Sequence, residues 1–155
     1  MIKEHRSLCE TQATYVVQMG RRLKVRYSID KHRRLIVTTA EGCVMFDDVR
    51  GHQDRLLVDP DFDVGFDQLI DTTAVTRFDI SADEARILAE RRIVSPESRR
   101  AFVATAPHIF GLGRMMEIYH ERLEYADVEV FDSTDEALKW LKRPARTGSG
   151  RRGTE

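Results

Sequence analysis

Residues 78–84, Phe-Asp-Ile-Ser-Ala-Asp-Glu, form the stretch whose residue types and spacing are best suited to chemistry. The hydroxyl of Ser81 is surrounded by the carboxylates of Asp79, Asp83 and Glu84, with Phe78 beside them. Ser81 and Glu84 have the spacing of a capping box, in which the serine hydroxyl accepts from the N3 amide and the glutamate reaches back. A phosphate at such a helix start would meet free amides and a favourable dipole. Ser81 can therefore be a structural cap or a regulatory phosphorylation site.

The same pattern occurs again near the end of the chain. Residues 133–136, Ser-Thr-Asp-Glu, also place a serine three positions before a glutamate. Helix initiation alone can therefore account for Ser81. Phosphorylation of Ser81 would add about two negative charges to an acidic stretch, and this charge could repel an acidic partner.

No other group of residues has the spacing of a catalytic or metal site. The acidic loop at residues 59–67 lacks the glycine and glutamate register of an EF-hand. The two cysteines show no nucleophile motif, and no phosphate-binding glycine-rich loop occurs. We predict no catalytic residue, metal or cofactor. The nearest polar cluster, at the expected strand ends, is Asp71, Asp79 and His108. The histidines are too scattered for a zinc motif: His5, His32, His52, His108 and His120.

The composition is that of one ordinary α/β domain. The chain has 155 residues, of which 41% are hydrophobic and 33% charged, with a net charge of -1. This balance predicts no bulk attraction to nucleic acid or anionic membranes. No apolar run reaches the roughly 18 residues needed to span a membrane, and the N-terminus has no apolar signal core. We expect a cytoplasmic protein, and two unpatterned cysteines, Cys9 and Cys43, suit a reducing compartment.

Strands and helices alternate along the chain. Period-two patterns and β-branched runs predict strands at residues 24–29, 35–39, 101–105 and 127–131. A central strand headed by Leu69 and Ile70 is expected to end in a turn region at residues 71–76. Helices are expected between Phe46 and Asp59, from Ser81, and at residues 110–124 and 133–141. We predict an extension at 1–22, a domain at 23–142 and a disordered basic tail at 143–155.

Apolar stripes at helical spacing indicate which faces are buried. The first helix has the stripe Phe46, Val49, Gln53, Leu56 and Leu57, and the helix at 110–124 has Leu112, Met115, Met116, Tyr119 and Leu123. The aromatic and methionine side chains of this half of the chain are expected to form the core. Some of them could instead line an apolar pocket, with Phe66, Phe78, Phe102, Phe110, Met115, Met116 and Tyr119 as the candidates.

The order of these elements resembles that of STAS domains, which include SpoIIAA-like anti-sigma-factor antagonists. In those antagonists a strand leads to an Asp-Ser-Ser-Gly type motif whose second serine is phosphorylated. Here Asp79 and Ser81 match two of the four positions, whereas Ile80 and Ala82 replace the first serine and the glycine. Residues 26–141 are also similar to small bacterial SpoIIAA-like proteins of unassigned function. The resemblance implies a mixed sheet of about five strands with helices mainly on one face.

The resemblance favours a non-enzymatic regulatory or protein-interaction module. Its working surface would comprise Phe78, Asp79, Ser81, Asp83 and Glu84, and its partner would be an unidentified protein. The alternative is a domain that binds a small apolar or lipid-like molecule. Self-association through an edge strand, either residues 127–131 or the opening hairpin, is a further expectation.

Overall fold

The computed structural model describes residues 22–122, 124 and 126–144. The expected N-terminal extension and the expected basic tail lie almost entirely outside these residues, as does Cys9. Within the described chain, every helix is too short or too polar to cross a bilayer.

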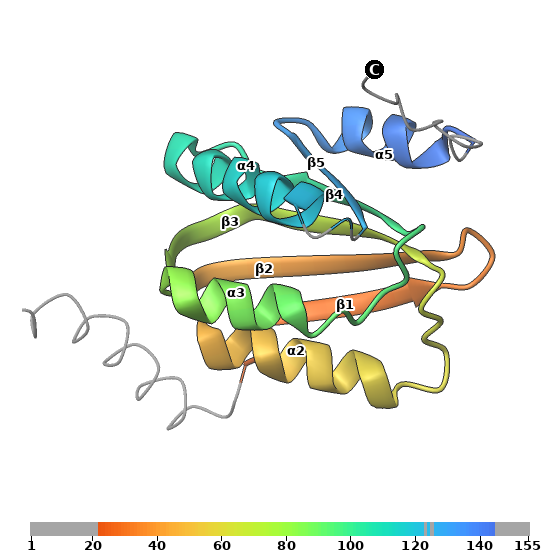
Figure 1. Ribbon diagram of the computed structural model, residues 1–155, viewed down its shortest axis with the longest axis horizontal. Helices are drawn as coiled ribbons and strands as arrows, with labels where there is room; N and C mark the ends of the chain where they lie inside the picture. Colours follow the sequence, from red (N-terminus) through yellow and green to blue (C-terminus); the bar gives the residue numbers. More distant parts are fainter. Residues whose placement is uncertain (1–21, 123, 125, 145–155) are drawn as a thin grey trace, which may run out of the picture.

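Five strands form one mixed sheet in the order β1-β2-β3-β4-β5, so that neighbours in sequence are also neighbours in space (Figure 1). The two edges of the sheet are β1 and β5, the strands that we expected to be available for self-association. β1 pairs antiparallel with β2, and all later pairs are parallel. The strands are β1 (Val25–Asp30), β2 (Leu35–Met45), β3 (Asp67–Asp79), β4 (Arg99–Val103) and β5 (Asp127–Phe131).

Helices cover both faces of this sheet unequally. Ala137 and Leu141 of α5 pack with Leu35, Leu69 and Ala101 on one face. The residues adjacent to these along the strands point the opposite way, toward α2, α3 and α4. The predicted mixed sheet with helices mainly on one face is therefore confirmed. The helices are α2 (Phe46–Val58), α3 (Ala82–Glu90), α4 (Pro107–Arg122) and α5 (Thr134–Lys142).

The central strand is longer than predicted, and the expected turn at residues 71–76 is wrong. β3 continues to Asp79 because it pairs with β2 as far as the end of both strands, with Val75 opposite Gly42 of β2 and Asp79 opposite Met45. The irregularity falls in β2 instead, where the register shifts on both sides of Gly42 and this glycine has a φ of 70°. Positive φ is readily available to glycine, so Glu41-Gly42 bends the strand without ending it.

The buried face of α4 is rotated from the predicted stripe. Ile109, Gly113 and His120 are its buried residues, whereas Met115 is 39% exposed. A Cβ atom on Gly113 would lie 2.8 Å from both Phe102 and Val130, so α4 approaches the sheet closely at this glycine. The prediction for α2 is wrong in the same way at Leu57, which is 48% exposed. His52, in the preceding turns of α2, is buried instead.

The two ends of α3 are held differently. At its C-terminal end Arg91 donates to the backbone oxygen of Arg50 (3.3 Å) and to Gln53 Oε1 (3.0 Å), and it pairs with Asp54. These three residues belong to α2. At its N-terminal end α3 follows β3 after only two residues, and the bonds of Ser81 are made within the helix start itself.

Candidate functional site

Ser81 caps α3 in the way its spacing predicts. Its backbone is extended, with φ -70° and ψ 162°, and its Oγ accepts a hydrogen bond from the Glu84 amide at 3.2 Å. The Glu84 carboxylate in turn accepts from the Ser81 amide at 2.9 Å. The Ser81 residue is nevertheless exposed. The capping box is confirmed, and it leaves Ser81 at the surface.

The acids around Ser81 are paired with arginines of their own segments. Asp79 lies 3.6 Å from Arg77, and Asp83 lies 3.8 Å from Arg86. The Asp83 side chain is 90% exposed. Exposed pairs of this kind contribute little to stability, so these charges are available to influence whatever approaches the start of α3.

Phe78 differs from the other residues of the predicted surface. It is half-buried and packs with Ile80 against a cluster that contains Val44 and Ile109. The structure therefore brings Asp79, Ser81, Asp83 and Glu84 together at the surface, while Phe78 anchors the strand end beneath them.

Ser133 has the same sequence pattern but not the same bonding. It is the N-cap residue of α5, with φ -134° and ψ 131°, and its side chain makes no capping hydrogen bond. Ser81 and Ser133 are therefore distinguishable in three dimensions although their local sequences are alike.

The polar cluster that we nominated at the strand ends is not assembled. Asp71 and Asp79 both lie in β3, eight residues apart, which is about 26 Å at 3.3 Å per residue. His108 hydrogen bonds to the backbone oxygen of Thr76 at 3.0 Å. In the part of the chain that the structure describes, no three histidine, cysteine, aspartate or glutamate side chains are grouped so that they could hold a metal ion.

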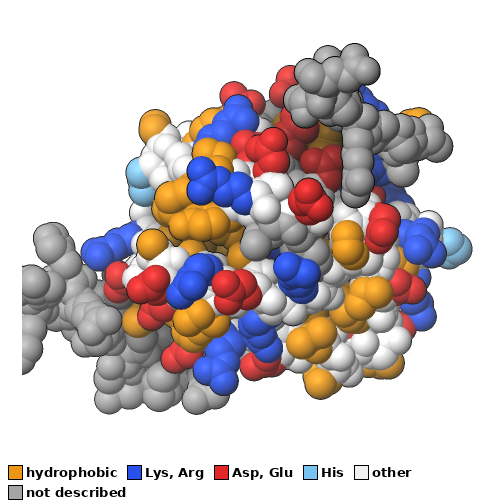
Figure 2. All heavy atoms as spheres, viewed as in Figure 1, with side chains coloured by type: hydrophobic (Ala, Val, Ile, Leu, Met, Phe, Trp, Pro, Cys, Tyr) orange, Lys and Arg blue, Asp and Glu red, His pale blue; other side chains and the backbone are white. Residues whose placement is uncertain are grey.

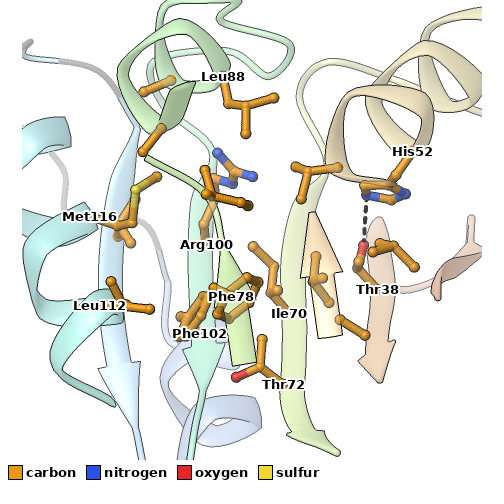
Figure 3. A pocket seen from close by; sticks show the side chains of 18 of the residues that line it. Thr38, His52, Ile70, Thr72, Phe78, Leu88, Arg100, Phe102, Leu112 and Met116 are labelled. Atoms are coloured by element: carbon orange, nitrogen blue, oxygen red, sulfur yellow. Dashed lines mark hydrogen bonds between the residues drawn. The ribbon is translucent and has the colours of Figure 1, made fainter. Parts of the chain in front are cut away.

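A cavity of about 180 Å³ lies beside Ser81, between the sheet and the helices on its main face, and is partly open to the surface. Its walls are mostly apolar, and Figure 3 shows Leu88 of α3 on one side of it and Leu112 and Met116 of α4 on another. Phe78 and Phe102 of the sheet also line it. Ser81 and Ala82 belong to the same lining, so the cap and the cavity are adjacent.

A chain of polar side chains crosses the sheet at this cavity. Arg100 Nε donates to Gln68 Oε1 at 3.1 Å, and Gln68 Nε2 donates to Thr38 Oγ1 at 2.7 Å. Thr38 Oγ1 lies 3.3 Å from His52 Nε2 (Figure 3). The chain thus joins β4, β3, β2 and α2, and all four residues line the cavity.

His52 is held neutral in this setting. Burial, together with the nearby Arg55 and Arg100 guanidinium groups, lowers its pKa to about 4. Its Nδ1 is buried and has no hydrogen-bond partner among the described residues. Burial, with the charge of Arg100 as a second cause, also lowers the pKa of His120, which lines the cavity from α4. Both imidazoles therefore add polarity without adding charge at neutral pH.

The sequence gives little sign of this polar chain. Each of Thr38, Gln68 and Arg100 stands between one apolar and one polar neighbour, the polar ones being Thr39, Asp67 and Arg99. The one available signal is a polar residue on the inward side of an otherwise buried strand, and it does not show that the three strands bring these residues together.

Neither a protein-family model nor a curated protein sequence matches the chain. Among solved structures, an uncharacterized protein of the DUF3478 family from Shewanella loihica PV-4, with a SpoIIAA-like fold, is similar with a TM-score of 0.56. The identity is 16%, over 79% of this chain and 97% of that one. The chain has a SpoIIAA-like fold. The anti-sigma factor antagonist SpoIIAA, in its unphosphorylated form, gives a TM-score of 0.49 at 11% identity, over 76% of this chain and 96% of that one. The SpoIIAA-like fold agrees with the predicted STAS-like domain.

Proposed function

We propose that this protein is a non-enzymatic, cytoplasmic regulatory module that binds a protein partner through the start of α3. The contact surface would comprise Asp79, Ser81, Asp83 and Glu84, with Phe78 supporting it from below. The observation that carries the proposal is the exposed position of Ser81 at a helix N-terminus on a SpoIIAA-like fold.

Charge gives this surface a means of regulation. A phosphate on Ser81 would lie at the positive end of the α3 dipole, which favours it. It would also face the Glu84 carboxylate, which lies within hydrogen-bond reach of the Ser81 amide. About two added negative charges beside Asp79 and Asp83 would weaken the binding of an acidic partner. Phosphorylation would therefore act as an off switch.

The test compares partner capture and phosphorylation across matched variants. Tagged wild type, Ser81→Ala and Ser81→Asp are recovered from the source cell, and the captured proteins and the intact masses are measured. We expect a partner that wild type and Ser81→Ala retain and Ser81→Asp loses, together with a phosphate on wild type that Ser81→Ala lacks.

Ser133→Asp is the control, because Ser133 begins a helix with the same local sequence. It should capture the same partner as wild type. Identical partners for Ser81→Asp and wild type, with no phosphate on the native protein, would refute the proposed switch.

A further inference from the structure

The cavity between the sheet, α3 and α4 combines an apolar wall with polar side chains that already have partners within the protein. We propose that it binds a small uncharged hydrocarbon, and that it discriminates against ions of the same size and of either sign. This inference does not depend on the proposed regulatory function, because it rests on the interior of the cavity and not on the exposed acids at the start of α3.

The size of the cavity sets the size of the ligand. A protein cavity of about 150 Å³ lined by leucine, isoleucine and phenylalanine side chains stays dry and binds benzene. The cavity in this protein measures about 180 Å³, and its wall is also mostly apolar. Ethylbenzene, a slightly larger hydrocarbon than benzene, is therefore an occupant of suitable size.

The polar side chains on the sheet side of the cavity are bonded inside the domain. Gln68 accepts from Arg100 at 3.1 Å and donates to Thr38 at 2.7 Å. Arg100 has a further interaction within the protein, so its guanidinium is not an unmatched charge. Thr72 donates at 2.6 Å to a backbone oxygen of β4. His52 Nε2 lies 3.3 Å from Thr38 Oγ1, and His52 Nδ1 is buried, so that it presents no surface to an occupant.

The polar side chains on the helix side are bonded in the same way. Gln53 of α2 donates at 3.4 Å to the backbone oxygen of Leu88, and it accepts from Arg91 at 3.0 Å. His120 of α4 bonds through Nδ1 to the backbone oxygen of Met116 at 2.9 Å. An occupant therefore meets side chains whose hydrogen-bonding groups are already used.

This bonding determines which molecules the cavity selects. The described lining contains no aspartate or glutamate that could pair with a cation. Burial lowers the pKa of both His52 and His120, so neither imidazole supplies a positive charge at neutral pH. An ion that entered would lose its hydration without gaining a partner of opposite charge, which is costly in an apolar setting. A hydrocarbon pays no such cost and gains from the burial of its surface.

The cavity opens between α3 and α4, beside the cap of α3. Ser81 and Ala82 line it from exposed positions, and Met115 lines it from α4 with 39% of its surface exposed. The half-buried Ala85 and Leu112 continue the wall inward from these residues. Figure 2 shows hydrophobic side chains gathered in the gap between the two helices. A hydrocarbon can therefore enter along an apolar path.

The test is a titration of the ¹⁵N-labelled full chain with ethylbenzene, followed by amide chemical shifts. We expect saturable shifts in α3, α4 and the strands that line the cavity. Benzylammonium and benzoate carry a positive and a negative charge on a similar ring. Each should bind about tenfold or more weakly than ethylbenzene, because each would bury a charge without a free partner.

Variants of α3 test whether the ligand occupies the cavity. Ala85→Phe fills part of it, and Ala82→Phe narrows its mouth from an exposed position, where the substitution is compatible with folding. Both should weaken ethylbenzene binding by about tenfold or more. Ile87→Phe is the control, because Ile87 is exposed on the same helix and does not line the cavity. It should retain the affinity of the wild type, and the dispersion of the amide spectrum shows that each variant is folded.

Three results would overturn the proposal. One is the absence of saturable ethylbenzene binding to the folded wild type. The second is an affinity for benzoate or benzylammonium that equals or exceeds the affinity for ethylbenzene. The third is unchanged ethylbenzene affinity in both folded variants, Ala85→Phe and Ala82→Phe. A failure of the Ser81 experiments would leave this titration unchanged, so the two proposals can fail separately.

Discussion

Replacing Gly113 by alanine tests how closely α4 is packed on the sheet. The new Cβ would lie 2.8 Å from Phe102 and Val130, a separation at which one of these groups must move. Overpacking of this kind costs about 1–3 kcal/mol. Alanine is also a better helix former than glycine by about 1 kcal/mol. The expected net effect is a loss of stability of about 0–2 kcal/mol.

Gly111→Ala separates the cost of overpacking from the gain in helix propensity. Gly111 lies in the same helix, and a Cβ there would meet nothing within 4 Å. It should therefore gain about 1 kcal/mol from helix propensity without a steric cost. Because the propensity gain is common to both variants, their difference isolates the packing term of about 1–3 kcal/mol.

Urea denaturation and calorimetry of the two variants measure this difference. At about 4 °C per kcal/mol for a domain of this size, Gly113→Ala should melt about 4–12 °C below Gly111→Ala. Equal unfolding free energies for the two variants would refute the close contact between α4 and the sheet.

Other substitutions test the cap, the buried histidine and the sheet. Ser81→Ala should cost about 1 kcal/mol in urea denaturation, and Ser133→Ala less, because only Ser81 makes the side-chain bond; equal losses would contradict this. The pKa of His52 is about 4 when folded and 6.5 ordinarily, so the unfolded chain binds the proton first and stability is lost as pH falls from about 6.5 to 4. The loss reaches about 3 kcal/mol. His52→Gln should remove this part of the pH dependence of the unfolding free energy, whereas His32→Gln, at an exposed histidine, should leave it unchanged. Thr72→Val should cost about 1–2 kcal/mol by unfolding, since its hydroxyl donates at 2.6 Å to a carbonyl oxygen of β4; an unchanged midpoint would count against that bond.

Local patterns in the sequence predicted most of the elements. The alternation around Tyr27 indicated β1, and the capping box at Ser81 marked the start of α3 to the residue. Such signals depend only on neighbours along the chain, through backbone preference and side-chain spacing. For the same reason they failed at residues 71–76, where an acid and several hydroxyls resemble a turn but pairing with β2 keeps the chain extended.

Packing against other elements explains the remaining errors. Hydropathy ranks Met115 above Gly113 and His120 as a core residue, yet α4 lies so close to the sheet that a Cβ atom at position 113 would force Phe102 or Val130 to move. The polar chain at the cavity comes from three strands and a helix, and no spacing along the sequence connects Arg100 with His52. Such sites become visible only when the sheet order and register are known.

The two ends of α3 are attached to the rest of the domain by different kinds of contact. Arg91 fixes one end of the helix to α2, and the opposite end, at Ser81, is joined to β3 by a connection of two residues. Ile80, in that connection, packs with Phe78 against the cluster that contains Val44 and Ile109. The start of α3 is therefore anchored by apolar contacts, whereas its other end is anchored by the hydrogen bonds and the ion pair of Arg91.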